Sequence, residues 1–314
     1  MPSTKRPGEL VPGPTGAPAR ILVAGDTHGN LGWISTLAKL AARHGCAGIV
    51  QLGDFGFWSD RKTRQAPALD ERFLNAVAMA LSRYKIWMRV IDGNHDAVPL
   101  VLERYEPGPD GIVQLRRGLD WATRGSRWEW AGVRFGALGG AVSIDKRMRT
   151  PGWSWWATEM IWPEDVERLG AGALDVLCTH EAPEGVGQPG VDFVQLPIRL
   201  LQEEADSRAC RRLVEQARQA TRPALLLHGH HHMRYRKEMD GAGVVTTVEG
   251  LGCDMDANGD AWGVLHLPGL GFADGWEVAR AGSEGREPDF GRVGRRRRLG
   301  LEARSGVPNG PSGA

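Results

Sequence analysis

The chain has 314 residues, of which 41% are hydrophobic and 25% are charged, a composition typical of globular proteins. Its formal net charge of +1 excludes a strong overall field that would draw the protein onto nucleic acid or an acidic membrane. The four cysteines form no CxxC pair, which argues against a thiolate zinc site and a disulfide-dense secreted scaffold, so a reducing cytoplasm is expected. No segment has the roughly 20 consecutive apolar residues of a membrane span, so no membrane partner is expected.

The two ends of the chain differ in composition from the middle. Residues 1–19 and 280–314 are rich in Gly, Pro, Ser and Arg and lack periodic apolar positions, so both segments are predicted to be disordered. A single folded domain is therefore expected at residues 20–279. The second segment contains the run Arg295–Arg298, which could contact nucleic acid, although such a run in a Gly/Ser-rich tail is more often solvated.

Between these ends, short apolar runs alternate with amphipathic segments. In the first part of the chain the patterns predict three strands, at Ile21–Ala24, Ile49–Leu52 and Trp87–Ile91, with helices between them at Leu31–His44 and Leu69–Arg83. A hairpin at Trp128–Leu138, turning at Ala131-Gly132, comes next and is followed by a strand at Leu174–Cys178. The last predicted elements are a charged helix at about Ile198–Ala220, a strand at Leu225–Leu227 and a hairpin at Tyr235–Val248 that turns around Asp240-Gly241. Strands that alternate with helices indicate α/β layering.

Polar side chains follow all five of the single predicted strands, at the carboxyl ends where open α/β sheets place their ligand sites. They are Asp26 and His28, Asp54, Asn94 and His95, His180, and His230 and His232. In Asp26-Thr27-His28 an extended segment would direct both outer side chains to one side. The same spacing relates the last two histidines, with His231 pointing away. An Asp after a strand is often only a helix cap, but five convergent clusters predict a metal site.

The predicted donor set contains oxygen and nitrogen ligands and no thiolate. Its members are Asp26, His28, Asp54, Asn94, His180, His230 and His232. Seven donors are more than the four ligands of one tetrahedral zinc site. They suit two divalent or trivalent ions that share one bridging carboxylate and a water or hydroxide. Two ions about 3.5 to 4 Å apart would lower the pKa of the shared water and clamp the oxygens of an in-line displacement at phosphorus. The pattern predicts metal-dependent phosphoester hydrolysis but does not distinguish Mn, Fe, Zn and Co.

The order of the motifs carries a family resemblance. GDTHGN at 25–30, Gly53-Asp54, GNHD at 93–96, His180 and GHHH at 229–232 together resemble the calcineurin-like metallophosphoesterase superfamily, over about residues 20–268. The resemblance implies two mixed β-sheets packed face to face with flanking helices, an αββα sandwich. It also implies a first metal on Asp26, His28 and His232, a bridging Asp54, and a second metal on Asn94, His180 and His230. His95 would lie by the leaving-group oxygen as proton donor or charge stabiliser, and with Asp54 would form the catalytic pair.

Departures from the family pattern narrow the subclass. After Gly53-Asp54 the chain reads FGFW, where protein Ser/Thr phosphatases carry a further Asp-Arg-Gly, so a protein phosphatase is disfavoured. The runs GDFGFW at 53–58 and GGAVSIDK at 139–146 resemble a bacterial and phage-type branch of the superfamily.

The segment Ser143–Trp156 follows the pair Gly139-Gly140, so a flexible turn can carry it over the sheet edge to border the active site. Arg147 and Arg149 would offer forked donors to phosphate oxygens, and Trp155 would offer stacking surface to an attached organic group. The alternative is a structural loop anchored by tryptophans, with both arginines facing water.

Three classes of function remain open. A hydrolase acting on a small-molecule or nucleotide phosphoester needs the full donor set and His95, and both are present. A nuclease is favoured by the arginine run in the tail and disfavoured by the near-neutral charge. A non-catalytic binding module would have lost ligands, and none is missing. A metallo-β-lactamase-type site is also considered, but its HxHxDH motif would need an Asp that this chain lacks there.

Overall fold

The computed structural model of the protein describes residues 11–12, 19–60, 66–186, 201–241, 243–256, 259–267, 269–275 and 277. Within these residues the strands form two seven-stranded mixed sheets. The first sheet has the order β1 (Val11–Pro12), β7 (Arg127–Trp130), β8 (Val133–Leu138), β9 (Val176–Thr179), β10 (Leu225–His228), β12 (Val244–Gly250) and β11 (Tyr235–Gly241). The second has the order β14 (Gly271–Asp274), β13 (Trp262–His266), β2 (Arg20–Ala24), β3 (Gly48–Gln51), β4 (Trp87–Val90), β6 (Leu119–Ala122) and β5 (Ile112–Arg116).

The two sheets pack face to face, and each is also covered on its outer face. On β2, Val23 joins the core between the sheets, whereas Leu22 joins the core under the helices. On β10, Leu227 lies between the sheets and Leu226 faces outward into a third cluster. Central strands are therefore buried on both faces, which explains why they read as continuous apolar runs rather than as alternating ones.

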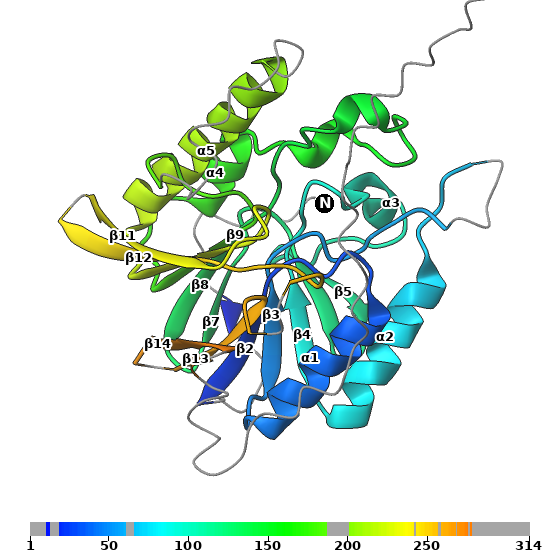
Figure 1. Cartoon of the computed structure of the whole chain (residues 1–314), viewed down its shortest axis with the longest axis horizontal. Helices are drawn as coiled ribbons and strands as arrows, with labels where there is room; N and C mark the ends of the chain where they lie inside the picture. Colours follow the sequence, from blue (N-terminus) through cyan, green and yellow to red (C-terminus); the bar gives the residue numbers. More distant parts are fainter. Residues whose placement is uncertain are drawn as a thin grey trace, which may run out of the picture.

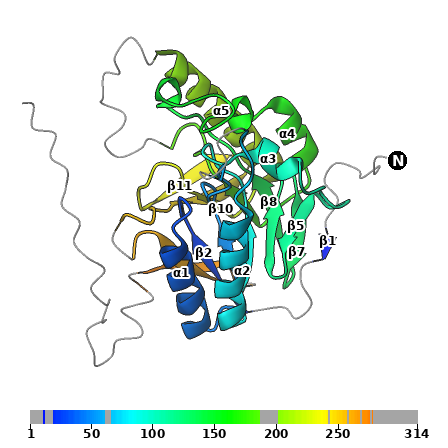
Figure 2. The same ribbon diagram turned by 90° about the vertical axis from the view of Figure 1, so that its right-hand side faces the viewer.

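Helices cover both outer faces, as Figures 1 and 2 show. The pair α1 (Leu31–Arg43) and α2 (Glu71–Tyr84) lies side by side on the second sheet, and α4 (Pro163–Leu169) and α5 (Leu201–Thr221) pack on the first. The short elements α3 (Val98–Leu102), η1 (Lys146–Met148) and η2 (Ala157–Glu159) lie in the connections. This four-layer arrangement confirms the predicted αββα sandwich.

Capping side chains fix the first residues of helices α1 and α2. The Asn30 side chain accepts a hydrogen bond from Trp33 N at 3.1 Å, and Asp70 accepts from Arg72 N and Phe73 N at 3.1 and 3.2 Å. These caps satisfy amide groups that have no partner inside the helix. They fix α1 directly after the GDTHGN motif.

All five strands that were predicted outside the hairpins are present, as β2, β3, β4, β9 and β10. Strands β2, β3 and β4 pair in parallel, and so do β8, β9 and β10. The first hairpin turns as predicted, since Trp130 pairs with Val133. The turn predicted around Asp240 is two residues early, because Gly241 still pairs with Val244. Gly243, with φ of 78°, supplies the left-handed conformation that this turn needs.

The terminal segments are described only in part. Val11–Pro12, inside the segment predicted to be disordered, pairs in parallel with β7. Residues 1–10 and 13–18, the start of the third predicted helix at 198–200, and the tail at 280–314 with Arg295–Arg298 lie outside the described residues. None of the described helices is both long and apolar enough to cross a membrane.

Candidate metal centre

Loops at the carboxyl ends of β2, β3 and β9 bring three donors together. Asp26, Asp54 and His180 are buried, and each offers a ligand atom within 4.8 Å of the others. His180 Nε2 lies 3.5 Å from Asp54 Oδ1, and His28 Nε2 lies 3.7 Å from Asp54 Oδ2. His95 Nε2 also lies 3.7 Å from Asp54 Oδ2. Asp54 therefore occupies the middle of the cluster, where the family resemblance expects the bridging ligand.

The Asp26 carboxylate has the surroundings of a metal ligand. Its Oδ2 atom is buried and has no hydrogen-bond partner. Two imidazole nitrogens nevertheless face it, His232 Nε2 at 3.0 Å and His28 Nε2 at 3.9 Å. A buried carboxylate oxygen without a hydrogen bond is costly unless a positive charge lies against it. A cation held between these atoms fits the donor set.

On the other side of Asp54, Asn94 and His180 face each other. His180 Nδ1 donates to Leu52 O at 2.7 Å, which directs Nε2 toward Asn94 Oδ1 at 3.0 Å. The Asn94 amide nitrogen donates to Ser143 Oγ at 2.9 Å, so its carbonyl oxygen is left to face the cluster. His230 packs beside them, with its ring centroid 5.1 Å from that of His180.

Charges in the cluster favour a cation. Burial lowers the pKa of His180, but the Asp54 and Asp26 carboxylates outweigh this and raise the pKa to about 10. The Asp26 carboxylate, with a further contribution from Cys253, raises the pKa of His232 to about 11. The carboxylates thus stabilise positive charge where the predicted ligands converge.

Backbone conformation at the ligands is unusual. His28, Asp54, His230 and His232 have φ of 43°, 51°, 66° and 51°, in the left-handed region that residues with a Cβ rarely adopt. The predicted extended geometry of Asp26-Thr27-His28 is therefore wrong, because the chain turns at His28. Two amides tie this turn to the next loop, since His28 N donates to Asp54 O at 2.8 Å and Gly29 N to Phe55 O at 3.0 Å. Such strain is often kept at functional sites.

Two carboxylates that the motif analysis left without a role support these loops. Asp254 Oδ1 accepts from His28 Nδ1 at 2.9 Å, which turns His28 Nε2 toward Asp26 and Asp54. Asp96 accepts four backbone N–H groups, and these belong to Phe55, Gly56, Phe57 and Gly93. Burial and the neighbouring Asp54 raise the pKa of Asp96 to about 6 against these hydrogen bonds. The GNHD motif contains Asp96, whereas no motif pointed to Asp254.

The buried carboxylate of Glu181 contacts two neighbouring histidines, His230 and His231. Glu181 Oε1 bonds His231 Nε2 at 2.7 Å, and Glu181 Oε2 lies 3.8 Å from His230 Nε2. Burial would raise the pKa of Glu181, but the two imidazoles outweigh it and hold that pKa well below its usual range. His231 therefore does not simply point away from the site, because it shares this carboxylate with a predicted ligand. Only the position of Glu181 directly after His180 could have signalled this.

The segment Ser143–Trp156 contacts the cluster at two points. Ser143 bonds Asn94, as described above, and Arg149 Nη2 lies 2.9 Å from His95 Nε2. Asp145 holds the Arg149 guanidinium through two hydrogen bonds of 2.8 Å.

The other two predicted substrate-binding residues of this segment, Arg147 and Trp155, differ in their surroundings. Arg147 donates to Glu203 Oε1 at 2.6 Å, on α5, so the structure separates it from Arg149. Trp155 is partly buried, and its neighbour Trp156 anchors the segment in the helix-side core. Trp128 and Trp130, in contrast, lie in the core between the sheets.

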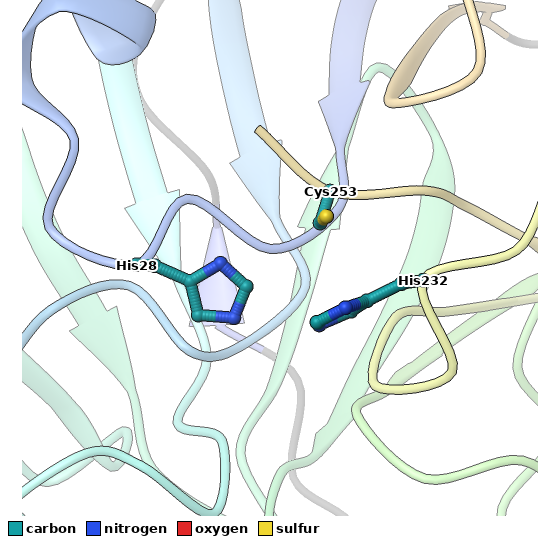
Figure 3. Close-up of side chains that lie close together, drawn as sticks. All are labelled: His28, His232 and Cys253. Atoms are coloured by element: carbon teal, nitrogen blue, oxygen red, sulfur yellow. The ribbon is translucent and has the colours of Figure 1, made fainter. Parts of the chain in front are cut away.

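A cysteine that the sequence analysis did not consider as a ligand also faces the centre. Cys253 offers its Sγ within 4.8 Å of the ring nitrogens of His28 and His232, and Figure 3 shows the three side chains around one space. The spacing of the four cysteines could not reveal this, because the partner residues come from distant parts of the chain.

Buried carboxylates and buried or partly buried imidazoles at the strand ends of an αββα sandwich indicate a metal-dependent hydrolase. A family model for calcineurin-like phosphoesterases matches residues 19–245, and the chain belongs to this family. It is a metallophosphoesterase, an enzyme that hydrolyses phosphoester bonds. No curated protein matches the sequence.

Several solved structures match most of the chain at low sequence identity. A Thermus thermophilus protein is 15% identical with a TM-score of 0.50, and the match covers 82% of this chain and 98% of that one. A dimetal phosphatase from Danio rerio is 12% identical with a TM-score of 0.43, covering 80% of this chain and 93% of that one. An archaeal phosphodiesterase is 11% identical with a TM-score of 0.37, covering 81% and 98%.

Proposed function

We propose that the protein hydrolyses a small-molecule or nucleotide phosphoester by in-line attack at phosphorus, with two metal ions in the candidate centre. The observation that carries the proposal is the position of Asp54. Its Oδ2 faces His28, and its Oδ1 faces His180, so one carboxylate stands between two groups of donors.

The donors divide into two sets around this carboxylate. Asp26, His28 and His232 would hold one ion, Asn94, His180 and His230 would hold the other, and Asp54 would contact both. When bound, two such ions would supply Lewis-acid charge to the phosphoryl oxygens and acidify the attacking water. Asp254 and Leu52 O accept hydrogen bonds from Nδ1 of His28 and His180, so that Nε2 of each ring faces the carboxylates.

In this proposal Arg149 would bind the phosphoester and His95 would take part in its turnover. A guanidinium only donates hydrogen bonds, so His95 Nε2 accepts from Arg149 and carries no proton. A phosphate oxygen that takes over this N–H would release His95 Nε2, which would then take up a proton from solvent and donate it to the leaving-group oxygen. Asp145 would keep the guanidinium in place during the exchange, since it binds the group at two points.

The partly buried Trp155 would then stack on the organic group of the substrate. Arg147 is not included in the proposed site, because its guanidinium is engaged by Glu203. The nuclease alternative rested on Arg295–Arg298, which lie outside the described residues.

The test is a screen of phosphomonoesters, phosphodiesters and cyclic nucleotides. The protein is stripped with a chelator, and Mn, Fe, Zn or Co is added back to each assay. We expect turnover of at least one small phosphoester that disappears on chelation and returns with metal. A rate that chelation leaves unchanged would contradict the two-metal mechanism, and preferential cleavage of DNA or RNA would favour a nuclease.

A further inference from the structure

Cys253 differs from the other three cysteines in its surroundings. All four are buried and free of disulfides. Cys46, Cys178 and Cys210 each belong to one of the three hydrophobic clusters, where a buried thiol acts as a small apolar side chain. Cys253 belongs to none of the hydrophobic clusters of the described residues, although it is only 1% exposed. Ordinary core packing therefore does not account for it.

The neighbours of Cys253 are predicted metal ligands. Its Sγ and the ring nitrogens of His28 and His232 all lie within 4.8 Å of one another, and the side chains converge on one space in Figure 3. Asp26 Oδ2, the buried oxygen without a hydrogen bond, lies 3.0 Å from His232 Nε2. The thiol thus stands beside the half of the centre that contains these three donors.

Backbone and side-chain bonds hold the cysteine in this place. Cys253 forms an isolated β-bridge with Asp26, and Asp254 N donates to Asp26 O at 3.0 Å. Cys253 N donates to Asp256 Oδ2 at 2.7 Å. The next side chain, Asp254, orients His28. The segment Cys253–Asp256 therefore holds the thiol in place and also positions two predicted ligands, Asp26 and His28.

We propose that Cys253 is a thiolate ligand of the metal ion held by Asp26, His28 and His232. On binding, the Sγ–H proton leaves to solvent and a sulfur–metal bond forms. A thiolate prefers soft or borderline ions, so this half of the centre would favour Zn²⁺, Co²⁺ or Cd²⁺ over Mg²⁺ and Mn²⁺. The inference rests on the proposed metal centre and adds a sulfur donor to its oxygen and nitrogen set.

The first test reads the sulfur–metal bond directly in the full-length protein. Loaded with Co²⁺, the wild type should show a near-ultraviolet thiolate-to-cobalt charge-transfer band. Cys253→Ser should lose the band, and Cys46→Ser, which changes a cysteine in the helix-side core, should keep it. X-ray absorption of the Zn²⁺-loaded wild type, which needs no variant, should show a sulfur shell at about 2.3 Å beside the nearer N/O shell.

The second test measures metal preference by competition. Cys253→Ser should lower the affinity for Cd²⁺ by at least about tenfold, while Mn²⁺ affinity changes much less. A cobalt-loaded wild type that hydrolyses phosphoesters but lacks the charge-transfer band would overturn the thiolate ligand and leave the proposed function standing. A zinc-loaded wild type whose X-ray absorption shows no sulfur shell would do the same. A wild type that binds neither ion would overturn both the ligand and the metal centre.

Discussion

The two carboxylate oxygens of Asp54 face different histidines of the proposed centre. One oxygen lies 3.5 Å from His180 Nε2, the other lies 3.7 Å from His28 Nε2, and its Oδ1 also accepts from His95 N at 2.8 Å. Replacing Asp54 with Ala should remove bound metal and all measurable turnover, because both ions lose a shared ligand. Elemental analysis of the purified variant checks this. Asp175→Ala, at a pair with Arg134, is the control and should keep its metal. Full metal content in Asp54→Ala would refute the bridging role.

The proposed role of His95 separates catalysis from metal binding. His95 follows Asn94, yet its Nε2 bonds Arg149 rather than a predicted metal ligand. Replacing His95 with Ala should therefore lower kcat by roughly 10² to 10⁴, the range of a general acid or base, while metal content stays near wild type. Steady-state kinetics and elemental analysis on the same preparation check both parts. Loss of metal in this variant would make His95 a ligand instead.

Arg149 and Arg147 form a matched pair for testing the phosphate clamp. Arg149 lies against His95, whereas Arg147 donates to Glu203. Arg149→Ala should reduce kcat/KM by about 1.5 to 3 kcal/mol, the scale of a hydrogen bond to a charged group, with metal content intact. Arg147→Ala should leave kcat/KM close to wild type. Equal losses in the two variants would argue that the segment has only a structural role.

At the scale of single elements, the strand-to-loop junctions show why glycine precedes the ligands. A Cβ added to Gly93 would lie 2.1 Å from Asp54 Oδ1, and one added to Gly229 would lie 2.2 Å from Asp26 Oδ1. Each glycine therefore allows a carboxylate from a neighbouring loop to approach the backbone. The repeated Gly in the motifs is thus a requirement of loop packing as well as of turn formation.

A substitution at one junction should disturb the ligand on another loop. Gly93→Ala should displace the Asp54 carboxylate and reduce both bound metal and activity, although residue 93 holds no metal itself. Gly269→Ala is the control, since an added Cβ meets nothing within 4 Å there. Metal content and circular dichroism of both variants decide the outcome. A Gly93→Ala protein with wild-type metal content would show that Asp54 can shift without loss of the site.

The strands that carry ligands could be predicted from sequence, whereas several edge elements could not. Strands such as β3 are buried on both faces and therefore read as apolar runs. The edge strand β5 alternates between buried and exposed positions, and β14 has no buried residue, so neither presents such a run. The alternation in β5 extends over only 5 residues, near the lower limit of what signals a strand, and β14 offers no apolar pattern.

The donors could be proposed from sequence because each lies within a few residues of the end of a predicted strand. The residues around them could not, because their partners are remote in the chain. Asp254 and His28, for example, are 226 positions apart. Cys253 and Glu181 were not predicted for the same reason, because neither belongs to a short sequence motif with the spacing of metal ligands. Sequence spacing detects side chains on one loop, and only the fold shows which loops meet.

At the scale of the whole molecule, one buried charge links the two sheets. Arg89 on β4 is 6% exposed and bonds Asp120 on β6 at 2.8 and 3.1 Å. Its guanidinium lies 4.8 Å from the ring centroid of Trp87 and 4.9 Å from that of Trp128, which belongs to the other sheet. The inter-sheet core therefore includes a cation that packs on aromatic rings of both sheets.

Removing this cation should destabilise the protein without a direct effect on the metal centre. In Arg89→Met the Asp120 carboxylate would keep Trp87 Nε1 as a donor, at 3.1 Å, but would lose its buried counter-charge. The free energy of unfolding should fall by about 3 to 5 kcal/mol, the usual result of breaking a buried ion pair. Urea denaturation checks this, with elemental analysis as the readout that the folded variant still binds metal.

The same variant gives a test that depends on pH. Burial raises the pKa of Asp120, and Arg89 opposes that rise, so Arg89→Met should raise the pKa of Asp120 further. Folded Asp120 would then bind a proton more tightly than unfolded Asp120, and stability should decrease as pH rises from the unfolded pKa through the folded one. The double variant Arg89→Met with Asp120→Leu removes both charges and should recover most of the loss. A double variant less stable than the single one would show that Arg89 acts through its packing on Trp87 and Trp128, not through its charge.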